Sequence, residues 1–372
     1  MRYCKKCVQP DTRPGIYFDK DGICGACLHE KDVNDSIDWK SRSEELKNIA
    51  KWAKENTKTD YDCAIGVSGG KDSLFQALYA RDELKLRVLL VNSEPEGITE
   101  IGRHNIENLI SLGFDCIKLR PNPRIIKKLM RRDFYKYLNP IKATEYSLFS
   151  STYIIAHKFN IPLIIQGENP GMTLGVRNTG VGTDGNALKA NELNTLSENW
   201  KNYIEDDIDA KALFLYHYNR ETIENLGIKG VWLQYYVKEW SQLHNADFSI
   251  SRGLKVREDY KSEDIGTYGR FYQLDSDLVQ VNQMLKFIKF GFGQCTDHAC
   301  YDIRAGIITR EKAIGLVKKY DGKCAEIFVK ALCDCIGISL EEFWKVADSF
   351  RGDMWGKDSK EEWNLKNPIW EQ

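Results

Sequence analysis

Short apolar segments alternate with helical segments over residues 59–175, and this alternation narrows the folds open to the chain more than any other feature. We expect strands at residues 61–67, 86–94, 115–120 and 161–167. We expect helices at residues 72–84, 99–112, 124–138 and 145–159. The alternation predicts an α/β fold, a doubly wound and mainly parallel sheet with helices on both faces. Because ligands of such folds bind at the carboxyl ends of the strands, we expect the site there.

The stretch "GVSGGKDS" (66–73) lies at one of these strand ends and leads directly into a helix. A glycine-rich turn before a helix offers backbone N–H groups and the positive end of the helix dipole, which favours a phosphate. Ser68 and Ser73 add hydroxyl donors, Lys71 adds a charge, and Asp72 suggests a bridging Mg²⁺ ion. The spacing is neither that of a Walker A loop nor G-x-G-x-x-G. The alternative interpretation is a structural turn with a capping serine.

Four of the eleven cysteines follow the pattern C-x2-C-x16-C-x2-C near the start of the chain. They are Cys4, Cys7, Cys24 and Cys27. Two such knuckles close a tetrahedron, so the pattern predicts a zinc ribbon with a short hairpin between the knuckles. Four ordinary thiols and a redox or iron–sulfur role are the alternatives.

The other cysteines carry weaker signals. Cys295, His298 and Cys300 in "GQCTDHAC" suggest a second metal or thiol site, although buried thiols are the simpler interpretation. The remaining five lie in apolar patterns and are expected in the core: Cys63, Cys116, Cys324, Cys333 and Cys335.

"SGGKDS" after a first strand resembles the pyrophosphate loop of the PP-loop ATP pyrophosphatases, and the resemblance covers residues 59 to about 175. In that superfamily the loop holds the β,γ-pyrophosphate while a substrate oxygen attacks the α-phosphate. The resemblance implies that ATP contacts Val67, Ser68, Gly69, Gly70, Lys71, Asp72, Ser73, Val91, Asn92 and Gly167. It implies catalytic roles for Lys71, Asp72 and Ser73, with Asp72 holding Mg²⁺. For Asn92 a structural turn at the strand end is the alternative.

Over nearly its whole length the chain resembles the N-acetyl sugar amidotransferases. The likeness rests on "CKKC", "CGAC", "GVSGGKDS", "QGENPGMTLG", "GTYGRFYQLD" and "FIKFGFGQCTDHACYDIRAGIITREKAI". These enzymes convert an acetamido group into an acetamidino group during assembly of O-antigen sugars and of pseudaminic or legionaminic acid. The chain departs from the family's "GRATD"-like form by placing Gln294 and Cys295 where Arg and Ala are expected.

Five further residues are candidates for substrate binding. Glu168 and Asn169 follow a strand at the same rim, where they would bind a second Mg²⁺ or the sugar, or form an Asx turn before the next proline. Asp297 and Arg304 lie in the same segment, where Arg304 would hold a sugar-nucleotide phosphate or a sugar carboxylate, or the two residues would belong to surface ion pairs. Tyr268 would form another wall of the substrate site.

No thiol glutaminase pattern is visible in the sequence, because position 2 is Arg and no cysteine lies in a G-x-C-x-G elbow. We therefore expect ammonia to be free or supplied by a separate glutaminase subunit, as the resemblance also implies.

The length and composition of the chain indicate which partners it binds and how many parts it has. The chain has 372 residues, a formal net charge of −1 and a pI of about 6.6, which favour a small polar partner over nucleic acid or a membrane. "MRYCKKC" lacks the apolar region of a signal peptide, so we expect a cytoplasmic protein. We expect four parts: a zinc ribbon (1–35), a connecting helix (36–58), the ATP pyrophosphatase domain (59–275) and a helical C-terminal subdomain (276–372).

Two other functions share some of these features. A PP-loop tRNA-modifying enzyme, for thiolation or lysidine formation, would also carry a zinc ribbon, and its strongest support is the basic run "RIIKKLMRR" (124–132). A nucleotide sensor without turnover would keep the loop glycines but would have no use for Asp72.

Overall fold

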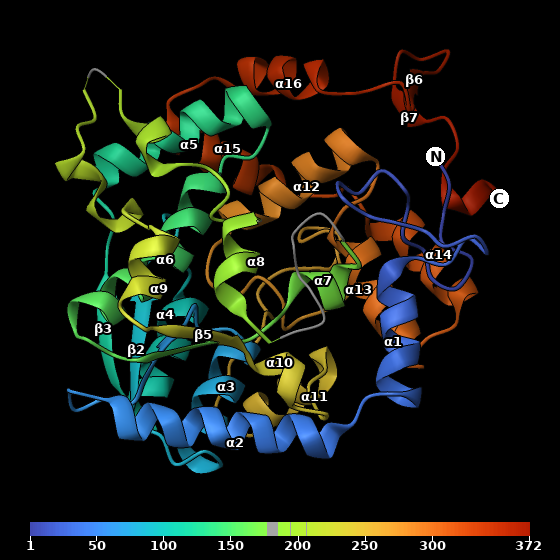
Figure 1. Ribbon diagram of the computed structural model, residues 1–372. Coiled ribbons are helices and arrows are strands. Elements are labelled where there is room, and N and C mark those ends of the chain that lie inside the picture. The colour runs from blue at the N-terminus through green and yellow to red at the C-terminus, as the bar shows by residue number, and fades with distance from the viewer. Residues whose placement is uncertain (177–184, 194, 206) are drawn as a thin grey trace.

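The computed structural model describes residues 1–176, 185–193, 195–205 and 207–372 (Figure 1). At its centre is a parallel five-stranded sheet with the order β3-β2-β1-β4-β5. The strands are β1 (Cys63–Gly66), β2 (Val88–Ser93), β3 (Asp115–Leu119), β4 (Leu163–Gln166) and β5 (Lys229–Trp232). The four expected strands are confirmed. The sequence did not suggest β5, because it is four residues long, contains Gly230 and lies at the edge of the sheet beside β4.

Alternate residues of the strands enter two different cores, so the sheet is doubly wound as predicted. Ala64 and Leu89 enter the core on one face, and Ile65 and Leu90 enter the core on the other. The first face packs on α6 (Lys142–Lys158), and the same core continues through α5 (Pro123–Tyr137) to α12 (Leu278–Phe290), α15 (Glu326–Ile336) and α16 (Leu340–Ser349). The second packs on α2 (Trp39–Asn56), α3 (Lys71–Asp82), α4 (Glu100–Ser111), α10 (Leu233–Tyr236) and α11 (Gln242–Ile250).

The N-terminal segment differs from the predicted ribbon hairpin. Only the isolated bridges Tyr3–Pro10 and Phe18–Cys24 form between its strand-like segments. The chain enters helix α1 (Gly25–Asp35) directly after Cys24, so the second cysteine knuckle is the first turn of a helix. This helix packs on the short helix α7 (Pro170–Leu174), which follows β4.

The C-terminal helices connect this segment to the sheet. α13 (Gln294–Arg304) and α14 (Arg310–Tyr320) pack on the cysteine-rich segment, and both chain ends lie on that side of the molecule (Figure 1). The tail docks on the body of the protein: Trp355 is buried and its Nε1–H donates to the carbonyl of Ile288 over 2.8 Å. The tail contains β6 (Trp355–Lys357), β7 (Trp363–Leu365) and the 3-10 helix η3 (Ile369–Glu371).

The other elements are α8 (Ala187–Leu193), α9 (Arg220–Asn225) and the 3-10 helices η1 (Trp200–Tyr203) and η2 (Lys211–Tyr216). Within the described ranges, none of the helices combines the length and the apolar character needed to cross a bilayer.

Candidate active site

The glycine-rich loop between β1 and α3 is shaped for an anion. Gly69 adopts a φ of +84°, and a Cβ there would lie 3.1 Å from the carbonyl oxygen of Gly102. Gly70 is the N-cap of α3 and provides no side-chain hydrogen bond to it. The N–H groups of the first turn of α3 therefore remain for a bound phosphate. Ser73 Oγ accepts a hydrogen bond from the backbone N–H of Ser68 over 3.1 Å, which holds the loop closed on the helix.

Helix α11 orients the two charged residues of the loop. Lys71 Nζ lies 2.7 Å from Asp72 Oδ2, and Asn245 Nδ2 donates to Asp72 Oδ1 over 2.7 Å. Ser249 Oγ donates to the carbonyl of Lys71 over 2.8 Å. Sequence reasoning missed Asn245 and Ser249, because no local signal connects them to residues more than 170 positions earlier.

Four predicted ATP-binding residues lie at or next to the carboxyl ends of β1, β2 and β4. The side chains of Val67 and Val91 are buried, and Asn92 Nδ2 donates to the carbonyl of Val67 over 2.8 Å. A Cβ at Gly167 would lie 2.8 Å from Trp240 Cη2, so only glycine lets β4 end so close to that ring. None of the four lines the cavity described next.

A cavity of about 540 Å³ opens in front of the loop. One part of its lining, which we call the loop end, comprises Ser68, Gly70, Lys71, Asp72 and Ser73, together with Glu168 and Gln242. The other part, which we call the other end, comes from α6, α12 and α13 and includes Glu145, Gln283, Gln294, Asp297, His298 and Tyr301. The sheet domain and the C-terminal helices thus share one cavity.

Two carboxylates meet at the loop end of this cavity. Burial raises the pKa of Glu168, and the charge of Asp72 raises it further. Gln242 Nε2 donates to Glu168 Oε2 over 3.3 Å. Mg²⁺ binds carboxylate oxygens and phosphates, so a carboxylate pair beside an anion-binding loop fits this ion. Asp72 and Glu168 would hold it.

Asp297 anchors the other end through two cations. Its carboxylate pairs with Arg13, from the cysteine-rich segment, and with Lys286 Nζ, which lies 2.7 Å away. Burial alone would raise the pKa of Asp297, but the charges of Arg13 and Lys286 hold it below its usual value. Asp297 therefore stays ionised and connects the N-terminal segment to the cavity wall.

Three other predicted substrate residues lie outside this cavity. Asn169 is fully buried, and its Oδ1 accepts from the first N–H groups of α7, which is the Asx-type cap considered above. Tyr268 donates its hydroxyl to Asp302 over 2.6 Å. Arg304 donates to the carbonyl of Thr173 over 3.1 Å and lines a neighbouring cavity of about 550 Å³.

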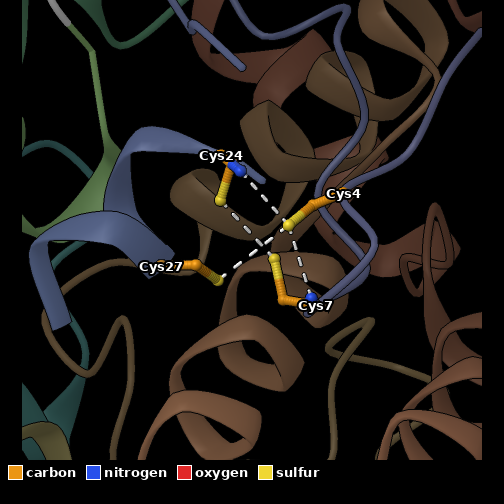
Figure 2. Close-up of side chains that lie close together, drawn as sticks. All are labelled: Cys4, Cys7, Cys24 and Cys27. Carbon is orange, nitrogen blue, oxygen red and sulfur yellow. Dashed lines mark hydrogen bonds between the residues drawn. The ribbon is translucent and has the colours of Figure 1, made fainter. Parts of the chain in front are cut away.

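The four N-terminal cysteines converge on one point (Figure 2). All four are buried, and their Sγ atoms lie within 4.8 Å of one another. The Cys7–Cys24 and Cys4–Cys27 pairs are separated by 3.7 and 4.0 Å. Tetrahedral Zn²⁺ with bonds of about 2.3 Å places its sulfur ligands about 3.8 Å apart, so the donor set fits zinc.

Helix α13 packs directly on this cysteine cluster through Cys295, Ala299 and Cys300. His298 faces the other way: its Nδ1 lies 2.6 Å from Thr267 Oγ1 and its ring stacks on Tyr272 at 3.4 Å. Burial lowers the pKa of His298 to about 3, so the ring is neutral. Among the described residues the N-terminal quartet is the only group of three or more His, Cys, Asp or Glu side chains close enough to share one metal ion, and the second metal site considered for "GQCTDHAC" does not form there.

These features define an α/β protein with a glycine-rich loop at the start of α3 and a separate cluster of four cysteines whose geometry fits a metal ion. Residues 265–371 match the family model described as "LPS biosynthesis protein WbpG-like, C-terminal domain". That stretch includes α12 and α13, which line the cavity.

Comparison with solved structures gave distant similarities. The NH3-dependent NAD synthetase of Campylobacter jejuni is 18% identical with a TM-score of 0.29, over 37% of this chain and 61% of that one. The NMN synthetase of Francisella tularensis is 16% identical with a TM-score of 0.29, over 60% of this chain and 100% of that one. The chain thus spans less than two thirds of the Campylobacter enzyme. A search of curated proteins gave no significant match.

Proposed function

We propose that this protein is an ATP-dependent, AMP-forming amidotransferase that converts the acetamido group of an N-acetyl sugar into an acetamidino group. One observation carries the proposal: the phosphate-binding loop and the C-terminal region that matches the WbpG-like model line the same cavity. A lipopolysaccharide-related family and a nucleotide loop around one space favour chemistry in which ATP activates a sugar.

The reaction needs activation because an amide oxygen is a poor leaving group. Attack of the acetamido oxygen on the α-phosphorus of ATP gives an imidate whose leaving group is AMP, and it releases pyrophosphate. The N–H groups at the start of α3, Ser68, Ser73 and Lys71 would stabilise the charge that moves onto pyrophosphate. Mg²⁺ bound by Asp72 and Glu168 would neutralise part of that charge.

The other proposed components follow from the same scheme. Ammonia would come from solution or from a separate glutaminase, and the sugar would be nucleotide-linked. The products would enter surface polysaccharide or flagellin glycans, as O-antigen, pseudaminic or legionaminic acid derivatives do. Zn²⁺ in the cysteine quartet would have a structural role, since all four ligand positions are filled by thiolates.

The structure gives little support to the RNA-modifying alternative. The basic run of residues 124–132 lies on α5, and its apolar side chains enter the core. Arg131 donates to the carbonyls of Ile336 and Gly337, and Arg132 pairs with Asp133. These two guanidinium groups are therefore engaged within the chain.

The test is a mass-spectrometric assay of the purified protein with ATP, Mg²⁺, ammonium and a panel of nucleotide-linked N-acetyl sugars. We expect AMP to appear with one sugar, together with a product in which O has become NH. If AMP were released with total tRNA and with none of the sugars, the sugar amidotransferase proposal would be wrong and the RNA-modifying function would be favoured.

A further inference from the structure

Three polar residues from three helices of the cavity lining carry hydrogen-bond acceptors that the proposed adenylation step does not use. Glu145 of α6, Gln283 of α12 and Gln294 of α13 all line the cavity. We refer to these three residues as the acceptor wall. No role was assigned to any of them from the sequence.

The two glutamines have oxygens without partners. Gln294 is 4% exposed, and its Nε2 donates to the carbonyl of Ile265 and to Gln280 Oε1. Because a carbonyl only accepts, these contacts fix which end of the Gln294 amide is nitrogen. Its Oε1, and Oε1 of Gln283, have no hydrogen-bond partner although both atoms are buried. Buried acceptors without partners are rare and costly, so both call for a ligand that donates.

Glu145 adds a carboxylate to this wall. Its side chain is exposed to the cavity, and the surrounding protein atoms displace enough water from the carboxylate to raise its pKa to about 7. The nearest cations are Lys142 and Lys286, but Lys142 pairs with Glu198 and Lys286 pairs with Asp297. Within the described part of the chain, Glu145 itself forms no ion pair.

Two free amide oxygens and an unpaired carboxylate select a ligand that is rich in N–H donors and carries positive charge. We propose that the acceptor wall is the nitrogen subsite, which binds ammonium before the reaction and the amidinium group after it. This inference rests on the proposed function and identifies where the incoming nitrogen is held.

The proposed amidine-forming reaction requires a site that holds the incoming nitrogen. Ammonium gives one proton to the Glu145 carboxylate, and the lone pair of ammonia forms a C–N bond to the adenylated imidate carbon. The C–O bond to AMP breaks, and its electron pair leaves with the phosphate. Two of the three remaining protons stay on the new nitrogen and the third moves to the sugar nitrogen. The product is a cationic amidinium with N–H donors on both nitrogens, which matches the acceptors of the wall.

The experiment compares wild type with Glu145→Gln and Gln283→Leu in two assays. The first measures amidine formation against ammonium concentration with a nucleotide-linked N-acetyl sugar as probe. The second measures sugar-dependent exchange of pyrophosphate into ATP without ammonium, which reports adenylation alone. We expect both variants to raise the KM for ammonium about tenfold or more and to keep the exchange rate near that of wild type.

The control is Glu55→Gln, on the exposed face of α2, which we expect to change neither assay. An unchanged ammonium KM in both cavity variants, with wild type active, would overturn the nitrogen subsite alone. A wild type that forms no amidine with any sugar would overturn the proposed function and the subsite with it. If one variant fails to fold, the other still decides the question.

Discussion

The two ends of the cavity are built in opposite ways. The loop end comes largely from one stretch of eight residues, in which turn, helix start, lysine and aspartate are consecutive. The other end combines α6 with α12 and α13, which follow α6 by more than 100 positions in the chain. The geometry of the loop end is set by neighbouring residues of one motif. The geometry of the other end is set by the packing of helices that are distant in the chain. The two ends should therefore respond differently to mutation and to loss of the metal.

The largest effect should follow from Asp72→Ala at the loop end. This substitution removes the carboxylate proposed to hold Mg²⁺ and leaves Lys71 without its partner at 2.7 Å. We expect AMP formation to fall by about 100- to 1,000-fold with the fold retained. Steady-state AMP release and circular dichroism are the measurements.

Asp82→Ala on the same helix is the matched control, because Asp82 is exposed and pairs only with the adjacent Arg81 in the described contacts. Asp82→Ala should be fully active. Normal turnover by Asp72→Ala would remove Asp72 from the proposed metal site.

The second-largest effect should be a loss of stability when zinc is removed, and it should involve the end of the cavity formed by α6, α12 and α13. α13 packs on the cysteine cluster, and Arg13 of that segment pairs with Asp297. We expect Cys7→Ser to lose bound zinc and to cost several kcal/mol of stability, since metal binding in such sites contributes directly to folding. Metal content by mass spectrometry and thermal unfolding are the measurements.

Cys335→Ser, at a half-buried thiol outside the cluster, is the control and should keep both the metal and the melting temperature within a few degrees. Should Cys7→Ser retain zinc and wild-type stability, the quartet would not be a structural metal site.

The same contrast between local and long-range contacts explains which parts of the fold and of the candidate site could be predicted from the sequence. "GVSGGKDS" and the cysteine spacing encode local geometry, so the anion-binding loop and the metal quartet were found from the sequence. The alternation of segments gave four strands and the fold class. By contrast, the contacts of Asn245 with Asp72 and of Arg13 with Asp297 span 173 and 284 positions. These two contacts form only when α11 and α13 pack in the folded protein. They therefore cannot be predicted from any short stretch of the sequence.

A smaller effect should come from Gly69→Ala in the loop. A left-handed conformation costs a non-glycine residue about 1–2 kcal/mol, and the new methyl would also press on the carbonyl of Gly102 at 3.1 Å. We expect a stability loss of about that size together with weaker ATP binding, measured by urea unfolding and by calorimetric titration.

Gly227→Ala separates backbone strain from function. Gly227 has a φ of +73° with nothing within 4 Å of an added Cβ, and it lies outside the cavity. It should lose similar stability and bind ATP as wild type does. If Gly69→Ala bound ATP equally well, the loop geometry would not be set by Gly69.

The last effect concerns the acceptor wall and the dependence of stability on pH. The folded-state pKa of Glu145 is raised by burial to about 7, from an ordinary value of 4.5, so the folded protein holds this proton more tightly than the unfolded chain. The contribution of Glu145 to stability therefore falls as pH rises from about 4.5 to 7 and is constant above that range. Glu145→Gln does not titrate, so it should melt at a higher temperature than wild type at pH 8, with the difference disappearing near pH 4.5. Glu55→Gln should show no such pH dependence. If the difference in melting temperature between Glu145→Gln and wild type stayed constant across this pH range, the pKa of Glu145 would be the same in the folded and unfolded protein. Glu145 would then be as accessible to solvent as a residue on the protein surface.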